Sequence, residues 1–242
     1  MAHDTDSKGY WDERLKRNFN SRGVGHMGFG EGYNRWVLRR KLRCLREVLR
    51  GVKLKDKRVL DVGCGTGLFI KWYLAKGCKV TGMDIAETSV TRLRAIFPCE
   101  FYAGDIAATD YPHPQERFDL VNMWDVIFHI VDDKAYNRAL DNIANHLKEG
   151  GLLLLTDYFG AAADMLLAPH VYGRCLQTYE INLRRRGLHL IQLRPLYRLL
   201  MKSHLGPLDD HLGSLYYFAD NWLRNIPADN ISLTIWRCCG VQ

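Results

Sequence analysis

The nine residues Val59–Gly67, VLDVGCGTG, constrain the fold more than any other part of the chain. A short apolar run leads directly into three glycines at alternate positions, Gly63, Gly65 and Gly67. Glycine lets the backbone turn sharply and lets a ligand approach main-chain N–H groups. The segment therefore predicts a buried strand, a tight turn with a ligand beside it, and a helix after the turn.

Strands and helices alternate along the rest of the chain. The clearest helix is predicted over Asp132–Lys148, with Asp132 as its cap and Gly150-Gly151 at its end. Such alternation gives a mostly parallel sheet covered by helices on both faces, with the ligand outside the carboxyl ends of the strands. We predict an α/β fold with a doubly wound, seven-stranded sheet in three α/β/α layers. The predicted strands are residues 58–62, 78–83, 100–103, 118–123, 152–156, 188–193 and 231–236, and the further helices are 68–76, 87–96 and 178–186.

The first 50 residues have a different composition. We predict a disordered tail over Met1–Lys8 and a flexible or closely packed cap over Gly9–Gly32, which is rich in glycine and aromatic residues. An amphipathic helix follows from Tyr33 to Gly51, with arginines on its polar face. Residues 1–50 are thus predicted to be an N-terminal helical arm that acts as a lid, and residues 51–242 to be the main domain.

Composition excludes several classes of protein. No apolar run approaches the roughly 20 residues of a membrane-spanning helix, and the N-terminus does not read as a signal peptide. The seven cysteines contain no Cys-x-x-Cys pair, which predicts no metal site and a reducing, cytoplasmic location. The formal charge is +7, and eleven basic residues against two acidic ones lie between Arg35 and Arg58. Such a stretch would attract an anionic surface or substrate.

The glycine turn does not match a dinucleotide site. The nicotinamide fingerprint requires glycine or alanine three residues after its second glycine, where this chain has Leu68. The pattern Asp61-x-Gly63-x-Gly65-x-Gly67 instead resembles the first motif of class I S-adenosylmethionine (SAM) dependent methyltransferases. The N-terminal arm is similar to that of bacterial small-molecule methyltransferases of this class. The resemblance implies a Rossmann-like fold and a SAM cofactor whose amino-acid part lies in the glycine loop.

The same resemblance implies further cofactor contacts at the next strand ends. Asp84, 19 residues beyond Gly65, would accept hydrogen bonds from the ribose hydroxyls, with Ile85 against the adenine. Asp105 would accept a hydrogen bond from the adenine amino group, with Ile106 packed nearby. The backbone around Met123 would face the methionine part.

Residues after the fourth and fifth strands are candidates for the methyl-transfer pocket. His129 is either a general base or a pocket-wall residue, because imidazole titrates near neutral pH. Tyr158, just past the fifth strand, is a second catalytic candidate. Three aromatic residues of the arm either stack on the sulfonium or anchor the arm: Tyr10, Trp11 and Tyr33.

The function implied is transfer of a methyl group from SAM to a small-molecule acceptor, with oxygen favoured. Residues 197–228, between the last two strands, are where this family inserts substrate-recognition segments. The alternatives are an RNA-directed enzyme that uses the basic stretch, an N-methyltransferase, and a SAM-binding protein without catalysis.

Overall fold

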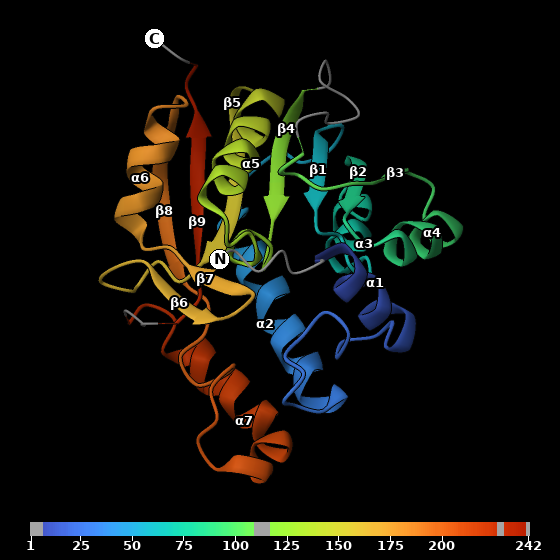
Figure 1. The fold of residues 1–242 in the computed structure, drawn as a ribbon, viewed down its shortest axis with the longest axis vertical. Helices are drawn as coiled ribbons and strands as arrows, with labels where there is room; N and C mark the ends of the chain where they lie inside the picture. Colours follow the sequence, from blue (N-terminus) through green and yellow to red (C-terminus); the bar gives the residue numbers. More distant parts are fainter. Residues whose placement is uncertain (1–6, 109–116, 227–229, 241–242) are drawn as a thin grey trace.

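A computed structural model describes residues 7–108, 117–226 and 230–240 of the chain. Its main sheet has seven strands in the order β3-β2-β1-β4-β5-β9-β8 (Figure 1). The first five in this order are parallel, and β9 runs antiparallel to both its neighbours. The predicted doubly wound, mostly parallel sheet is confirmed. The strands are β1 Arg58–Val62, β2 Lys79–Asp84, β3 Glu100–Ala103, β4 Phe118–Met123, β5 Leu147–Asp157, β8 Leu188–Pro195 and β9 Ser232–Cys238.

Helices cover both faces of this sheet. Because neighbouring residues of a strand point to opposite faces, Val59 and Leu60 of β1 enter two different hydrophobic clusters. One cluster includes Phe69 and Leu93 from helices on one face, and the other includes Leu140 from the opposite face. The three layers are therefore confirmed. The covering helices are α3 Leu68–Leu74, α4 Glu87–Ile96, α5 Asp133–His146 and α6 Leu176–Arg184.

The junction of α5 and β5 differs from the prediction. Asp132 caps α5, since its side chain accepts a hydrogen bond from the Ala135 N–H (2.7 Å), but the helix ends at His146. The buried Leu147 already pairs with Phe118 of β4, and the register then shifts. Gly150, predicted as the helix end, lies inside this irregular start of β5 with φ +76°. Strand pairing and burial of Leu147 outweigh the helical periodicity.

The N-terminal arm contains two helices, α1 Ser7–Arg17 and α2 Glu31–Val48. Of the tail predicted over Met1–Lys8, residues 1–6 lie outside the described part, and Ser7 and Lys8 are helical, so the prediction is wrong there. The loop between the helices folds around the buried Asn34, which accepts from the His26 N–H and donates to the carbonyls of His26, Phe29 and Gly30. A side chain on Gly25 would lie 2.1 Å from Asn34 Oδ1, so the glycine content reflects close packing.

A hairpin, a helix and two 3-10 turns were not predicted. The hairpin β6 Met165–Ala168 and β7 Val171–Gly173 follows β5, with a 3-10 turn η1 Ile127–His129 beside it. After β8, the 3-10 turn η2 Gly206–Leu208 leads into α7 Asp209–Trp222, which packs along α2 below the sheet (Figure 1). Arg40 of α2 is buried at this junction and donates to the carbonyls of Pro195 and Leu196, so the predicted arginine face of α2 is not wholly solvated. Within the described residues, no helix has the length and apolar character needed to cross a bilayer.

Candidate active site

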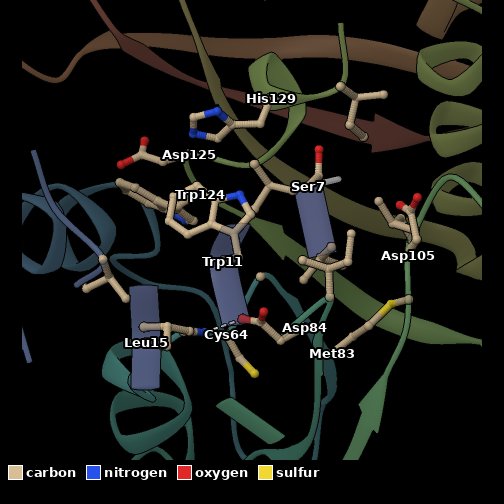
Figure 2. A pocket seen from close by; sticks show the side chains of 18 of the residues that line it. Ser7, Trp11, Leu15, Cys64, Met83, Asp84, Asp105, Trp124, Asp125 and His129 are labelled. Carbon is tan, nitrogen blue, oxygen red and sulfur yellow. Dashed lines mark hydrogen bonds between the residues drawn. The ribbon is translucent and has the colours of Figure 1, made fainter. Parts of the chain in front are cut away.

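A cavity of about 530 Å³ lies at the carboxyl ends of the parallel strands, beneath α1 and α2 (Figure 2). The glycine turn after β1 forms its floor, and residues after β2, β3 and β4 form its sides. Seven of the residues predicted for the site line this one cavity: Gly63, Gly65, Asp84, Ile85, Asp105, Ile106 and His129.

The glycine turn folds back on β2. The N–H groups of Gly63 and Cys64 both donate to the Met83 carbonyl, at 2.7 and 3.0 Å. Gly63 has φ +71°, and a Cβ there would lie 2.2 Å from Val126 Cγ2. The turn thus requires glycine for its conformation and for the close approach of the segment after β4.

Asp84 ends β2 and ties the turn to it. Its Oδ2 accepts from the Gly65 N–H (2.7 Å) and its Oδ1 from the Ala86 N–H (2.9 Å). Burial raises the pKa of Asp84, and these two N–H groups partly offset that effect. Each carboxylate oxygen keeps a second lone pair for a ligand hydroxyl. Asp105 also lines the cavity, and its Oδ1 accepts a hydrogen bond from the Ala107 N–H (2.8 Å).

Asp61 lies behind the glycine turn and does not line the cavity. Its Oδ1 accepts from Asn122 Nδ2 (2.6 Å), and Asn122 in turn accepts from the Tyr73 hydroxyl and the Trp124 indole. Its Oδ2 is buried without a hydrogen-bond partner in the described chain. Burial raises the pKa of Asp61 to about 7, so a cation bound at the turn would favour its charged form.

Three other predicted site residues also lie outside the cavity lining. Gly67 begins α3 and faces Leu93 and Phe97, while Met123 is buried in the core. Tyr158 packs against Phe128 and Gly173. The side chains of Met123 and Tyr158 are engaged in packing contacts. Trp124 and Asp125, the next residues after Met123, are the ones that reach the cavity.

His129 lies on the turn η1 and lines the cavity. Its Nδ1 is 3.0 Å from the His170 carbonyl on the β6–β7 hairpin. A carbonyl only accepts hydrogen bonds, so Nδ1 is the protonated nitrogen and Nε2 is the basic one. Burial lowers the pKa of His129 to about 4, so the ring is neutral at pH 7. The hairpin therefore sets the tautomer of this imidazole.

An ion pair joins the arm to the end of β4. The buried Lys41 of α2 pairs with Asp125, and both residues line the cavity. Asp125 has φ +56°, and the Thr156 hydroxyl both accepts from its N–H (2.7 Å) and donates to its Oδ1 (3.0 Å). A non-glycine residue held in this conformation is typical of functional sites. The basic stretch in the sequence contained Lys41, but no local pattern distinguished it from its exposed neighbours.

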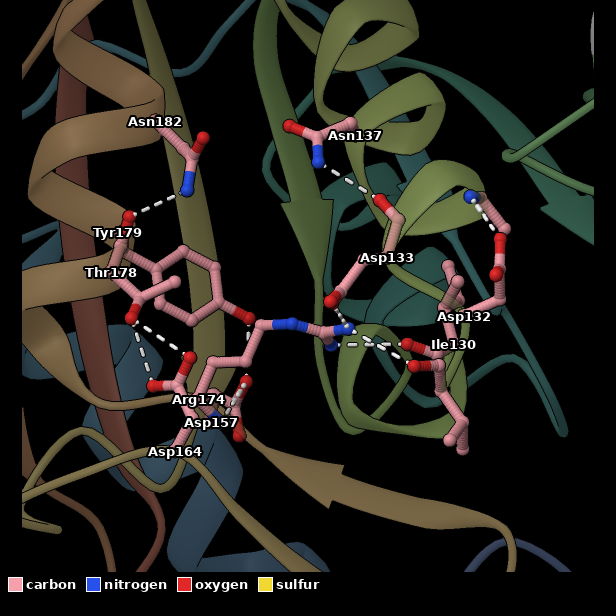
Figure 3. Close-up of polar contacts among 12 residues, drawn as sticks. Ile130, Asp132, Asp133, Asn137, Asp157, Asp164, Arg174, Thr178, Tyr179 and Asn182 are labelled. Atoms are coloured by element: carbon pink, nitrogen blue, oxygen red, sulfur yellow. Dashed lines mark hydrogen bonds and ion pairs between the residues drawn. The ribbon is translucent and has the colours of Figure 1, made fainter. Parts of the chain in front are cut away.

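Arg174 supports one wall of the cavity from outside (Figure 3). This buried side chain, directly after β7, donates to the carbonyls of Ile130 (3.0 Å) and Val131 (3.3 Å) and to Asp133 (2.9 Å). Its guanidinium lies 3.8 Å from the centre of the Tyr136 ring. Ile130 and Val131 line the cavity, so Arg174 is a positioning residue that sequence reasoning missed.

Helix α1 covers the cavity. Trp11 and Leu15 point into it, and the Trp11 ring meets His129 edge-on with centroids 5.1 Å apart. The Asp12 carboxylate accepts from the Thr88 N–H (2.7 Å) at the start of α4, which anchors the helix to the sheet domain. Of the other predicted aromatics, Tyr10 is exposed, and Tyr33 is buried between Phe29 and Tyr216 away from the cavity.

The comparisons with known proteins agree with this geometry. A family model described as a methyltransferase domain matches residues 33–204. The ubiquinone biosynthesis O-methyltransferase of Chromobacterium violaceum is 30% identical over 171 residues, which cover 68% of this chain and 67% of that protein. The same-named enzyme of Idiomarina loihiensis is 34% identical over 131 residues, which cover 50% of this chain and 51% of that protein.

Solved structures share the fold. The N-methyltransferase NodS of Bradyrhizobium japonicum, solved with S-adenosyl-L-homocysteine, superposes with a TM-score of 0.61 at 19% identity, over 94% of this chain and 98% of that one. The glycine turn, the carboxylates at successive strand ends and the matched family model lead to one conclusion. The chain belongs to the class I S-adenosylmethionine-dependent methyltransferases.

Proposed function

We propose that this enzyme transfers a methyl group from SAM to an oxygen atom of a small-molecule acceptor. The observation that carries the proposal is the single cavity that holds the glycine turn, Asp84, Asp105 and a neutral His129 together. A base that is already unprotonated at pH 7 suits a hydroxyl acceptor, which must lose its proton as the methyl group arrives.

The residues present fit the cofactor. Asp84 and Asp105 offer acceptor oxygens for hydroxyl and amino groups, and Ile85 and Ile106 offer apolar surface beside them. The unpartnered Oδ2 of Asp61 lies behind the turn, and a cationic ligand bound there would favour the charged form of this carboxylate. When bound, SAM supplies an electrophilic methyl group on a positively charged sulfur.

The acceptor would occupy the part of the cavity nearest α2 and the end of β4. Phe69 and Trp124 form an aromatic wall there, with ring centroids 4.9 Å apart, and Leu38 lies on the same lining. The Lys41–Asp125 pair supplies the polar groups. Two of the three Lys41 ammonium hydrogens remain for an acceptor oxygen, which favours an aromatic acceptor with a hydroxyl or anionic substituent.

In this proposal the part played by the protein is at His129, whose Nε2 would take the proton that the acceptor hydroxyl loses on methylation. The His170 carbonyl holds the ring in the required tautomer, and the nearby negative charge of Asp125 stabilises the imidazolium that forms. Trp11 and Leu15 exclude water from the reacting atoms, so α1 acts as a lid. The related proteins named O-methyltransferases support oxygen as the acceptor atom.

Two measurements test the proposal. Calorimetry with SAM and S-adenosylhomocysteine should show binding of both, and labelled SAM should transfer its methyl group to a hydroxyl compound in a panel of hydroxyl, carboxyl and amine acceptors. Transfer to amines alone would show that the acceptor atom is nitrogen and not oxygen. NodS, which shares the fold, is named an N-methyltransferase. Binding without transfer to any class would indicate a cofactor-binding protein.

The free thiols of all seven cysteines are consistent with the proposed cytoplasmic location.

A further inference from the structure

The basic stretch of the sequence forms a stripe on one side of α2 that the active site does not use. Five exposed arginines recur every three or four residues along and just beyond this helix. Arg35 and Arg43 pair with Glu31 and Glu47, whereas the other three have no acidic partner within the described chain. The stripe consists of Arg35, Arg39, Arg43, Arg46 and Arg50.

Helix α7, which packs along α2, carries an exposed apolar stripe. Four large hydrophobic residues lie on one side of it at helical spacing, beginning just before its first turn. Trp222 is 83% exposed and Phe218 63%, which is unusual for residues whose burial is so favourable. The stripe consists of Leu208, Leu215, Phe218 and Trp222.

The two stripes form one continuous face. The Arg39 guanidinium lies 4.3 Å from the centre of the Trp36 ring, and the Trp36 ring contacts Phe218, with centroids 6.3 Å apart. The Trp36 ring also contacts the Tyr217 ring, with centroids 5.2 Å apart. Cationic and apolar groups are thus presented side by side on these two helices. Helices α2 and α7 pack together below the sheet (Figure 1).

We propose that this α2/α7 face docks the enzyme onto an anionic lipid surface. Arginine is attracted to lipid phosphates, and exposed tryptophan, phenylalanine and leucine gain free energy when they enter the boundary between headgroups and acyl chains. A second copy of the chain fits less well, because the five arginines would meet their own symmetry mates. RNA also fits less well, because the aliphatic Leu208 and Leu215 cannot stack on bases.

The test is co-sedimentation of the full chain with vesicles of equal parts phosphatidylglycerol and phosphatidylcholine, compared with phosphatidylcholine alone. Binding should be confined to the anionic vesicles and should weaken with salt. The double variants F218S/W222S and R39Q/R46Q should each lower vesicle affinity by about tenfold or more. The matched controls I181S/I191S and R184Q/R185Q remove exposed residues elsewhere, on β8, on α6 and directly after α6, and should bind as the parent does.

Other outcomes would overturn the proposal. No binding to anionic vesicles, or equal losses in the control variants, would show that the face is not a lipid site. A parent dimer that F218S/W222S converts to monomers would assign the face to self-association, and salt-sensitive RNA binding lost in R39Q/R46Q would assign it to nucleic acid. Affinity for S-adenosylhomocysteine should be unchanged in all four variants, which shows that they fold and separates this test from that of the methyltransferase assignment.

Discussion

The two halves of the cavity are built in different ways. The half proposed for the cofactor comes from the ends of neighbouring strands between residues 62 and 106, held by backbone contacts such as Gly65 N–H to Asp84. The acceptor half brings together α1, α2, the segment after β4 and the hairpin that holds His129 through the His170 carbonyl. The first half depends on local backbone geometry, whereas the second depends on side-chain contacts between distant segments. Substitutions in the cofactor half should therefore weaken SAM binding, whereas substitutions in the acceptor half should lower turnover.

The largest effect is expected from His129→Ala, which should lower kcat by about 10²–10⁴-fold because it removes the proton acceptor. Affinity for S-adenosylhomocysteine should stay close to that of the parent. The matched control is His170→Ala, which keeps the backbone carbonyl that bonds Nδ1 and should retain most of the turnover. Since the pKa of His129 is about 4, activity should fall through this group only as pH drops toward 4. Unchanged turnover in His129→Ala would show that His129 lines the pocket and is not the general base.

Arg174→Met tests whether the acceptor half depends on a remote support. Loss of the guanidinium leaves the carbonyls of Ile130 and Val131 unpaired, and we expect a loss of about 3 kcal/mol in the free energy of unfolding. Chemical denaturation measures this change. The exposed Arg184→Met on α6 serves as the control and should change stability by less than about 0.5 kcal/mol. Equal stability of the two variants would show that the Ile130–Val131 segment does not depend on Arg174 for its position.

Asp84→Ala addresses the cofactor half. Loss of hydrogen bonds to a charged group should weaken SAM affinity by about 1.5–3 kcal/mol, as measured by calorimetry. Asp119→Ala removes a carboxylate at the other end of β4, where it pairs with Lys57 and Lys148, and should leave SAM affinity unchanged. If Asp84→Ala binds SAM as the parent does, the ribose does not lie at this carboxylate.

The smallest effect concerns the attachment of the lid. Asp12→Ala removes the carboxylate that accepts the Thr88 N–H and should cost about 1 kcal/mol of stability. The Lys16 and Thr88 hydrogen bonds lower the pKa of Asp12 from 3.8 to about 2 in the folded protein. Its contribution is therefore complete above pH 3.8 and lost as pH falls through 2. Glu13→Ala, a neighbouring carboxylate that also pairs with Lys16, is the control, and an equal loss there would remove Asp12 as the anchor.

Much of this molecule could be predicted from local patterns. Glycines with φ above +50° at Gly63 and Gly65, and carboxylates at the ends of β2 and β3, follow from a few adjacent residues, and the structure has them on one cavity. Local patterns carry less information where packing decides how a side chain is placed. Tyr158 is at a strand end like Asp84, but its ring turns toward Phe128, and Lys41 resembles its neighbours until α2 is packed over Asp125.

The sequence by itself determined the order of the seven strands of the main sheet, the helices that cover it, and the glycine turn that lines the cavity. Those features arise from residue-by-residue conformational preference and from the periodicity of apolar side chains, which are written within short windows of chain. Only the tertiary structure decided which histidine nitrogen is basic, which lysine is buried, and that the arginines of α2 lie beside the apolar stripe of α7. Each of these depends on contacts between segments far apart in sequence, whose energies exist only after the chain has folded.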